Sequence, residues 1–283
     1  MKIAFLGYGE AARAFHEGLS RPGLSFVAYD ILLERGDEPM HSAMLQRGAE
    51  VADLAALGEV DWIFSAVTAD QSFLAVKPLL PHLRQGQLLI DINSVSPDRK
   101  RETAAAVEAT GAIYLDMAVM APVHPRGHAT PVLLAGPEAE RLLPELSTLG
   151  FSASIAGAEP GAATAIKMVR SLFVKGLEAI TVETLLAARA SGCFEEIVAS
   201  LSASFPGLDW PHFAEYQMER TTRHGKRRAA EMRESAATLD ALGLRGGLAS
   251  EIAEVQERMG ACGVGPDASL GDTVARALEM RLG

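Results

Sequence analysis

The chain has 283 residues, of which 48% are hydrophobic and 22% charged, and this is typical of a globular protein with one large domain or two moderate ones. Its formal net charge of −10 repels polyanions, so we expect neither nucleic acid nor a membrane surface as a partner. The two cysteines, Cys193 and Cys262, show no metal-ligand spacing and predict neither a disulfide framework nor a metal site. Strand-like residues begin at Lys2 and leave no room for a signal peptide, so we expect a cytoplasmic protein.

Residues 1–158 alternate short apolar runs with stretches of helical pattern. The clearest elements are strands at 3–6, 26–29, 62–67, 88–92, 112–118 and 131–135, and helices at 10–20 and 97–109. Strands that are continuously apolar and separated by helices are typical of a parallel sheet covered on both faces. We therefore expect an α/β fold that begins with a doubly wound Rossmann domain over residues 1–158.

From residue 161 onward the pattern is almost entirely helical, with breaks at 191–192, 206–207, 243–247 and 260–266. The helix predicted over 161–190 has apolar residues at helical spacing, and its charged residues exclude a membrane span. At 1.5 Å per residue this helix would be roughly 45 Å long, a length suited to crossing between two domains or two subunits. We expect residues 159–283 to form an all-α domain that serves substrate binding and dimerisation.

A glycine-rich turn follows the first predicted strand and opens the first predicted helix. Its residues are Gly7, Tyr8, Gly9, Glu10, Ala11 and Ala12, which match G-x-G-x-x-G with alanine in the third glycine position. The first glycine permits a tight turn, the second lets the backbone approach a pyrophosphate, and the small alanine lets helix and strand pack closely. The phosphates then lie at the positive end of the helix. The turn predicts a dinucleotide site.

Asp30 stands at the end of the second predicted strand, about 20 residues after the turn, where a carboxylate binds the ribose hydroxyls. A carboxylate there repels the 2′-phosphate of NADP, so we expect NAD. Arg35 follows within a few residues, so NADP stays an alternative. We also expect Val67 and Thr68, at the end of the strand at 62–67, to contact the cofactor.

Three stretches resemble the β-hydroxyacid dehydrogenase family, which includes 6-phosphogluconate and 3-hydroxyisobutyrate dehydrogenases and the related imine reductases. They are the turn GYGEAA, the segment DINSVSP at 91–97 with YLDMAVM at 114–120, and GAATAIK at 161–167. The resemblance implies that Asn93 and Ser94 lie beside the nicotinamide. It also implies that Asp116 and Met120 belong to the substrate loop and that Lys167 is catalytic. It further implies a dimer formed through the helical half.

The chain departs from the family pattern in the substrate loop. Met120 occupies the place of the family's serine, Ala121 and Pro122 that of its paired glycines, and Ser171 that of an asparagine. The stretches 167–171 and 224–232 look like a 6-phosphogluconate dehydrogenase-like branch with its own C-terminal domain. We therefore expect a substrate different from those of the well-known members, or other groups that hold it.

Lys167 is the predicted general acid/base, because hydride transfer from an alcohol needs a group to take the hydroxyl proton. Burial and the positive end of a helix would lower the pKa of its ammonium. Arg170, Ser171 and Lys175 follow at i+3, i+4 and i+8, on the same stripe of the helix. We expect Ser171 to orient the lysine or bind substrate and Arg170 to bind substrate; a solvated polar face is the alternative.

A second basic cluster, which we call the 220–228 cluster, contains Arg220, Arg223, His224, Lys226, Arg227 and Arg228. Arginine offers a planar fork that matches a carboxylate or phosphate. We expect His224 and Arg227, one turn apart, to bind an anionic substrate. The alternative is an exposed helix face with Glu219 and Glu231 as ion-pair partners.

The leading interpretation is an NAD(P)-dependent oxidoreductase that acts on a small hydroxyacid or its carbonyl partner. One alternative is an imine reductase or reductive aminase, which the apolar Met120 would suit. Another is an NAD(P)-binding protein without turnover. We expect a homodimer and no metal.

Overall fold

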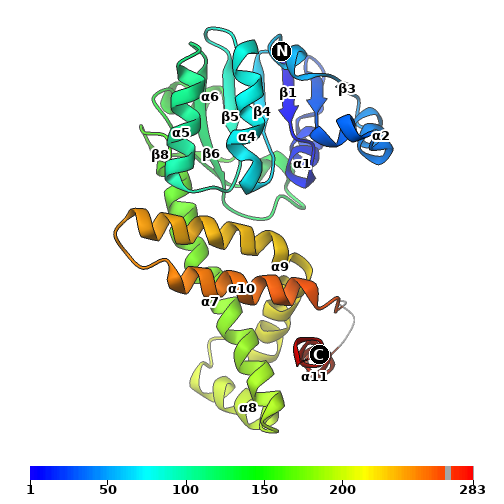
Figure 1. Cartoon of the computed structure of the whole chain (residues 1–283), viewed down its shortest axis with the longest axis vertical. Coiled ribbons are helices and arrows are strands. Elements are labelled where there is room, and N and C mark those ends of the chain that lie inside the picture. Colours follow the sequence, from blue (N-terminus) through cyan, green and yellow to red (C-terminus); the bar gives the residue numbers. More distant parts are fainter. Residues whose placement is uncertain (265–268, 283) are drawn as a thin grey trace. The chain divides into compact units, whose positions relative to one another are not determined.

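A computed structural model describes residues 1–264 and 269–282 (Figure 1). The chain divides into two compact units, residues 1–168 and 169–283. The division lies after the expected boundary at 158/159, inside a long helix. The reason is that the start of this helix is bonded to the sheet of the first unit, where Asp116 accepts a hydrogen bond from the backbone nitrogen of Thr164.

The first unit contains one eight-stranded sheet in the order β3-β2-β1-β4-β5-β6-β7-β8. The strands are β1 (Lys2–Leu6), β2 (Ser25–Tyr29), β3 (Ala49–Val51), β4 (Trp62–Ser65), β5 (Leu88–Asp91), β6 (Ile113–Val119), β7 (Val132–Ala135) and β8 (Ala153–Gly157). Neighbouring strands from β3 to β6 are parallel, which confirms the doubly wound fold. The expectation of parallel strands is wrong for β7, which is antiparallel to β6 because the connection at 120–131 contains no α-helix that would carry the chain back across the sheet.

Helices cover both faces of this sheet (Figure 1). The α-helices are α1 (Glu10–Leu19), α2 (Glu38–Gln46), α3 (Leu54–Leu57), α4 (Ser72–Val76), α5 (Pro97–Glu108) and α6 (Ala139–Thr148), and the short 3₁₀ helices are η1 (Ile31–Arg35), η2 (Ala69–Gln71), η3 (Lys77–His82) and η4 (Gly127–Ala129). Alternate residues of β1 divide between two buried cores, with Phe5 in the core beneath α1 and Leu6 in the core beneath α5. The continuous apolar run of this strand follows from burial on both faces.

The parallel strands place all their carboxyl ends at one edge of the sheet. The strand order reverses between β1 and β4, and a doubly wound sheet binds its ligand at such a reversal, outside the carboxyl ends of the strands. The segments that follow β1, β2, β4 and β5 therefore meet at this edge. They contain every residue that the sequence assigns to the cofactor.

The second unit is helical among its described residues, as expected. Its helices are the part of α7 (Ala162–Ala190) from residue 169 onward, α8 (Phe194–Ser204), α9 (Trp210–Ala241), α10 (Gly247–Ala261) and α11 (Leu270–Leu282). Part of the break predicted at 260–266 lies outside the described residues, and α10 ends at Ala261. Within residues 1–264 and 269–282, no helix combines the length and apolar character needed to cross a membrane.

Helices α9 and α10 lie side by side in the second unit (Figure 1). They approach closely at two glycines, since a Cβ on Gly225 would lie 2.1 Å from the carbonyl oxygen of Gln256 and 2.6 Å from the nitrogen of Gly260. Below the surface, the Arg228 guanidinium of α9 forms a two-pronged ion pair with Glu178 of α7, one arm of which measures 2.9 Å. This pair and the glycine crossing hold α7, α9 and α10 together.

Candidate active site

The glycine-rich turn has the geometry of a phosphate cradle. Gly7 has φ +85°, and a Cβ there would lie 2.6 Å from Val67 Cγ1 and 2.7 Å from the carbonyl oxygen of Ala66, so only glycine fits. Gly9 precedes the first residue of α1, and a Cβ built on it meets nothing within 4 Å. The residues present therefore suit a pyrophosphate that approaches the backbone at the helix start.

Between these glycines, Tyr8 directs its side chain into the core. The ring is completely buried, and its hydroxyl is hydrogen-bonded to Nδ1 of buried His16 at 2.6 Å. Burial raises the pKa of Tyr8 to about 12 and lowers that of His16 to about 4. The Tyr8 side chain is therefore turned away from a cofactor at the turn, and contact through its backbone stays a prediction. Ala12 is completely buried against the sheet, whereas Glu10 is exposed at the start of α1 and Ala11 is half-buried.

Asp30 follows β2 directly, at the carboxyl edge. Its Oδ2 accepts a hydrogen bond of 2.8 Å from the backbone N–H of Tyr8, and its Oδ1 accepts one of 3.0 Å from Leu32. The carboxylate is half-buried and keeps exposed surface for further donors. Arg35, at the end of η1, is exposed.

Asn93 links the segments that follow β4 and β5. Its amide oxygen accepts a hydrogen bond of 2.7 Å from the backbone N–H of Val67, and its amide nitrogen donates to Ser65 Oγ at 2.9 Å. The Asn93 side chain is buried, and its hydrogen bonds hold the segments after β4 and β5 together beneath the carboxyl edge of the sheet. Thr68 is exposed beside it, and Val67 is half-buried.

Lys167 and Ser94 meet at this edge. Lys167 Nζ donates a hydrogen bond of 2.5 Å to Ser94 Oγ, and both side chains are half-buried. Ser94 lies three residues after the end of β5, and Lys167 lies in the second turn of α7. The structure therefore brings together two residues that the sequence separates by more than seventy positions.

Gly161 lies immediately before α7 and permits the helix to begin against α5. Its φ is +96°, and a Cβ there would lie 2.9 Å from the carbonyl oxygen of Pro97. The backbone nitrogens of Gly161 and Thr164 each donate to Asp116 Oδ2 at 3.1 Å. Asp116 is completely buried, so the expectation that it contacts substrate is wrong for this structure: its carboxylate faces the start of α7.

Lys100 of α5, which the sequence did not indicate as a site residue, is also completely buried. Its ammonium lies 3.1 Å from Asp91 Oδ1 and 3.2 Å from Asp116 Oδ1, and it donates to the Asp91 carbonyl at 2.7 Å. Tyr114 donates to the other oxygen of Asp91 at 2.7 Å, and burial raises the pKa of that hydroxyl well above its usual range. Two aspartates inside predicted buried strands were the available signal, because buried carboxylates need partners.

Met120 is half-buried at the end of β6 and packs on a small cluster of buried alanines that includes Ala163 of α7. The side chain in the place of the family's loop serine is thus apolar and lies beside the start of α7.

The structure describes residues 1–264 and 269–282, and among these it contains no group of three or more His, Cys, Asp or Glu side chains that would hold a metal ion.

In the second unit, Ser171 accepts a hydrogen bond of 3.0 Å from Lys175 Nζ, which also pairs with Glu231 at 2.8 Å. Ser171 and Lys175 are both buried, whereas Arg170 is exposed. The polar stripe predicted along this helix therefore splits into an exposed arginine and a buried serine–lysine–glutamate group.

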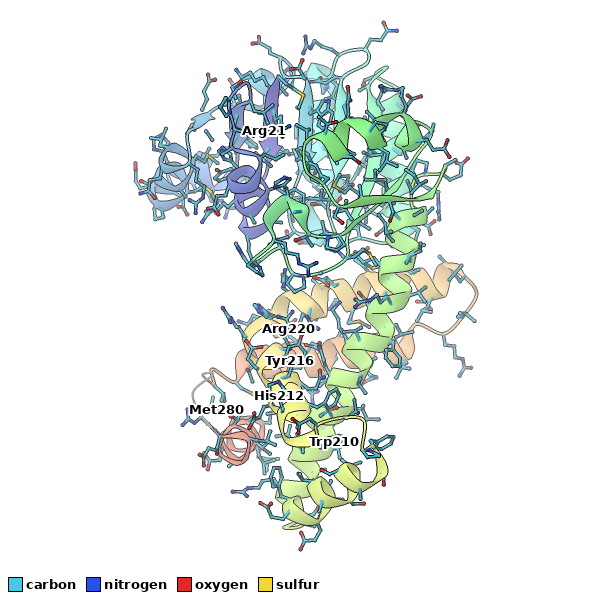
Figure 2. All side chains as sticks on the ribbon, turned by 180° about the vertical axis from the view of Figure 1, so that it is seen from behind. Arg21, Trp210, His212, Tyr216, Arg220 and Met280 are labelled. Carbon is cyan, nitrogen blue, oxygen red and sulfur yellow. The ribbon has the colours of Figure 1, made fainter. Side chains whose placement is uncertain are left out.

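The 220–228 cluster also divides. Arg228 is buried in the ion pair with Glu178, Arg223 pairs with Glu219 at 3.3 Å, and Arg220 lies over the ring of Tyr216, which Figure 2 labels beside it on α9. His224 is half-buried and Arg227 exposed. Burial, and then the neighbouring arginines, lower the pKa of the His224 imidazole. The alternative of an exposed helix face with ion-pair partners is therefore correct for Arg223 and Glu219. It is wrong for Arg228, which is buried with Glu178.

A doubly wound sheet with a glycine turn and a carboxylate after β2 defines a nicotinamide-dinucleotide-binding domain. Residues 2–157 match the family described as the NAD binding domain of 6-phosphogluconate dehydrogenase, and residues 188–259 match a domain of unknown function, DUF1932. The first match covers more than half of the chain. The chain belongs to the β-hydroxyacid dehydrogenase family, as the resemblance in its sequence predicts.

Two named enzymes are similar to parts of this chain. Mitochondrial 3-hydroxyisobutyrate dehydrogenase of Homo sapiens is 24% identical over 119 residues, which cover 41% of this chain and 35% of that enzyme. The match thus spans about a third of its length. The NAD-dependent L-serine dehydrogenase of Pseudomonas aeruginosa is 24% identical over 218 residues, covering 74% of this chain and 71% of that enzyme.

A solved structure is similar over nearly the whole chain. The conserved hypothetical protein from Sinorhizobium meliloti is 32% identical, covers 99% of this chain and 96% of its own, and has a TM-score of 0.77. The similarity therefore includes the helical half.

Proposed function

We propose that this chain is an NAD-dependent dehydrogenase or reductase that acts on a small hydroxyacid or its carbonyl partner, with Lys167 as general acid/base. The observation that carries the proposal is the hydrogen bond from Lys167 Nζ to Ser94 Oγ at the carboxyl edge of the dinucleotide-binding sheet. A titratable amine at this edge supports acid/base chemistry beside a nicotinamide, because a doubly wound sheet binds its ligand outside the carboxyl ends of its strands. The names of the human and Pseudomonas relatives support a hydroxyacid.

A bound nicotinamide would supply a hydride acceptor for the carbon that carries the hydroxyl group. Lys167, as the neutral amine, takes the hydroxyl proton, and as the ammonium it returns a proton to the carbonyl oxygen in the reverse direction. Ser94 holds the amine by its hydroxyl. The half-buried setting limits the number of water molecules that compete for the amine.

Asp30 supports NAD over NADP, because its carboxylate stands where the ribose lies and disfavours a 2′-phosphate. Arg35 is exposed, lies five residues after Asp30 in the sequence, and would offer a cation to the 2′-phosphate of NADP, so NADP stays the alternative. For the substrate, Met120 supports a less polar contact than a serine gives. We assign Arg170, His224 and Arg227 to binding of an anionic group, and Ser171 to binding the substrate or orienting Lys167.

The test is steady-state kinetics on a panel that includes L-serine and 3-hydroxyisobutyrate, with NAD and NADP separately. Lys167→Ala is expected to lower turnover by about 10²–10⁴-fold while the Kd for NADH stays unchanged. Lys77→Ala, an exposed lysine of the same unit, is the control and should retain wild-type turnover. Wild-type turnover in Lys167→Ala would contradict the proposal.

The same panel separates the alternatives. Reduction of cyclic imines without hydroxyacid oxidation would favour an imine reductase. Tight NADH binding with no turnover on acids, aldehydes or imines would favour a binding protein. Either result would overturn the proposed reaction.

We also propose a homodimer formed through the helical half. Val169, Phe173 and Ile180 of α7 are exposed apolar side chains at helical spacing, and an exposed apolar stripe is typical of an interaction surface. Light scattering at micromolar concentration should give twice the 30.0 kDa chain mass. Phe173→Glu should shift the protein to the monomer, whereas a wild-type monomer would exclude this assembly.

A further inference from the structure

We propose that Asp116, Lys100 and Thr164 are positioning residues that hold the Lys167 amine at Ser94. The proposal rests on the proposed function of Lys167 and concerns residues that touch neither cofactor nor substrate. All of them lie in the first unit.

Asp116 acts as a cap for α7, although it belongs to a different element. A helix begins with backbone N–H groups that have no partner inside the helix, and a side-chain oxygen usually satisfies one of them. Here the Oδ2 of Asp116, in the middle of β6, accepts from the nitrogens of Gly161 and Thr164. The first turn of α7 is thereby tied to the sheet, and its direction is set by a strand.

Lys100 supplies a cation beside this buried carboxylate. Asp91 and Asp116 are register partners on the neighbouring strands β5 and β6, so two buried carboxylates stand side by side. The Lys100 ammonium lies within 3.2 Å of an oxygen of each. A cation between them compensates a repulsion that burial would otherwise make severe.

Thr164 supplies the second tie. Its hydroxyl donates a hydrogen bond of 2.8 Å to the carbonyl of Val95, the residue next to Ser94, and its side chain is completely buried. Lys167 comes three residues after Thr164, which is nearly one helical turn. One bond therefore fixes the distance between the two backbone segments that carry Lys167 and Ser94.

These ties matter because acid/base catalysis depends strongly on position. A misplacement of about 1 Å from a change away from the reacting atoms can lower the rate by about 10²-fold. A lysine has a long flexible side chain, so a fixed backbone origin limits where its amine can lie. The network supplies that fixed origin from both β5 and β6.

Thr164 gives a clean substitution pair. Thr164→Val keeps the side-chain volume but removes the hydroxyl, and Thr164→Ser keeps the hydroxyl but removes a methyl group. The matched control is Thr103→Val: Thr103 is equally buried, but its hydroxyl donates to Arg99 within α5 itself. A role in packing alone predicts that the serine variant is affected at least as much as the valine variant.

The first readout needs no substrate. Acetylation of Lys167 by acetic anhydride, followed by mass spectrometry across pH, measures the accessibility and protonation of this amine, with Lys77 in the same digest as reference. Thr164→Val should alter the labelling rate of Lys167 several-fold, whereas Thr164→Ser and Thr103→Val should match the wild type. Equal labelling in all four proteins would overturn the proposal.

The second readout is kinetic and uses whichever compound of the panel the wild type turns over. Thr164→Val and Asp116→Asn should lower kcat and move the pH profile of turnover, while the Kd for NADH is unchanged. Thr164→Ser should keep the kcat and the pH profile of the wild type. Circular dichroism melts identify any variant that is not folded. If Lys167→Ala retains turnover, the proposed function fails; if it loses turnover but Thr164→Val behaves as wild type in both readouts, only the positioning role fails.

Discussion

Oδ2 of Asp30 lies 2.8 Å from the backbone nitrogen of Tyr8, so the carboxylate that follows β2 is bonded to the turn that follows β1. The same side chain thus serves the expected ribose contact and the shape of the phosphate cradle. A substitution at this position changes both, and the two effects can be separated by the residue chosen.

Asp30→Asn should keep an acceptor for the Tyr8 N–H but lose the negative charge. We expect its Kd for NADH to rise by about tenfold, since a hydrogen bond to a charged group contributes about 1–1.5 kcal/mol more than one to a neutral group. The preference for NAD over NADP should decrease at the same time. Fluorescence titration with NADH and NADPH measures both quantities.

Asp30→Ala, which also removes the acceptor, should bind both cofactors more weakly than Asp30→Asn. An asparagine variant with unchanged cofactor preference would mean that the ribose lies elsewhere.

Gly7→Ala should abolish most dinucleotide binding. The added Cβ meets Val67 Cγ1 at 2.6 Å and the Ala66 carbonyl at 2.7 Å, so the turn and the segment after β4 must separate. The matched control is Gly23→Ala, because Gly23 has a similar φ of +90° but open space around its Cβ. Both variants should lose about 1–2 kcal/mol of stability from backbone strain. Gly7→Ala should lose further stability because of the steric clash, and should bind NADH at least about tenfold more weakly in a titration. Gly23→Ala should show neither of these two effects.

Arg228→Met should destabilise the protein by about 3–5 kcal/mol, because it leaves the Glu178 carboxylate buried without its cation. Arg223→Met breaks an exposed pair with Glu219 on the same helix and should cost about 0–1 kcal/mol. Urea unfolding followed by circular dichroism compares the two. Similar losses in both variants would mean that the buried pair does not stabilise this helix packing.

Stability should fall in acid because of His16. Burial, and then the nearby Arg47 charge, lower the pKa of this imidazole from 6.5 to about 4, with Glu17 acting in the opposite direction. The unfolded chain therefore binds a proton at a higher pH than the folded chain does. The contribution to stability is complete above pH 6.5 and is lost as the pH falls to about 4.

We expect His16→Gln to flatten this part of the pH dependence, by about 1–3 kcal/mol between the two ends of the window. Glutamine keeps a polar partner for the Tyr8 hydroxyl. The measurement is the urea midpoint as a function of pH for both proteins. Parallel curves would show that another group titrates in this range.

The first half of the fold was predictable because each central strand is a run of apolar residues. The central strands β1, β2, β4 and β5 were found within a few residues of their bounds. The two edge strands were missed: β3 has three residues, and β8 reads ASIAG, with small residues that give little pattern. Edge strands bury less side-chain surface, so their sequences are less constrained.

The candidate site was partly predictable because the glycine turn, Asp30 and the GAATAIK stretch carry local signals. Lys100 was not, since it lies in the charged run DRKRE, which reads as an exposed helix start. Arg228 was assigned to a basic surface for the same reason. In both cases the partner is distant in sequence, Asp116 for Lys100 and Glu178 for Arg228, and charge patterning along one segment cannot identify such a partner.

Because the Lys100 ammonium is enclosed between Asp91 and Asp116, substitutions at these three positions should be coupled in evolution. Replacing Lys100 alone leaves two neighbouring anions in the interior, and replacing Asp116 alone frees the start of α7. Single replacements at either place should therefore be selected against, whereas homologous chains that lose the lysine should have lost an aspartate as well. Joint variation at 91, 100 and 116 is the signature to seek when homologous sequences are aligned.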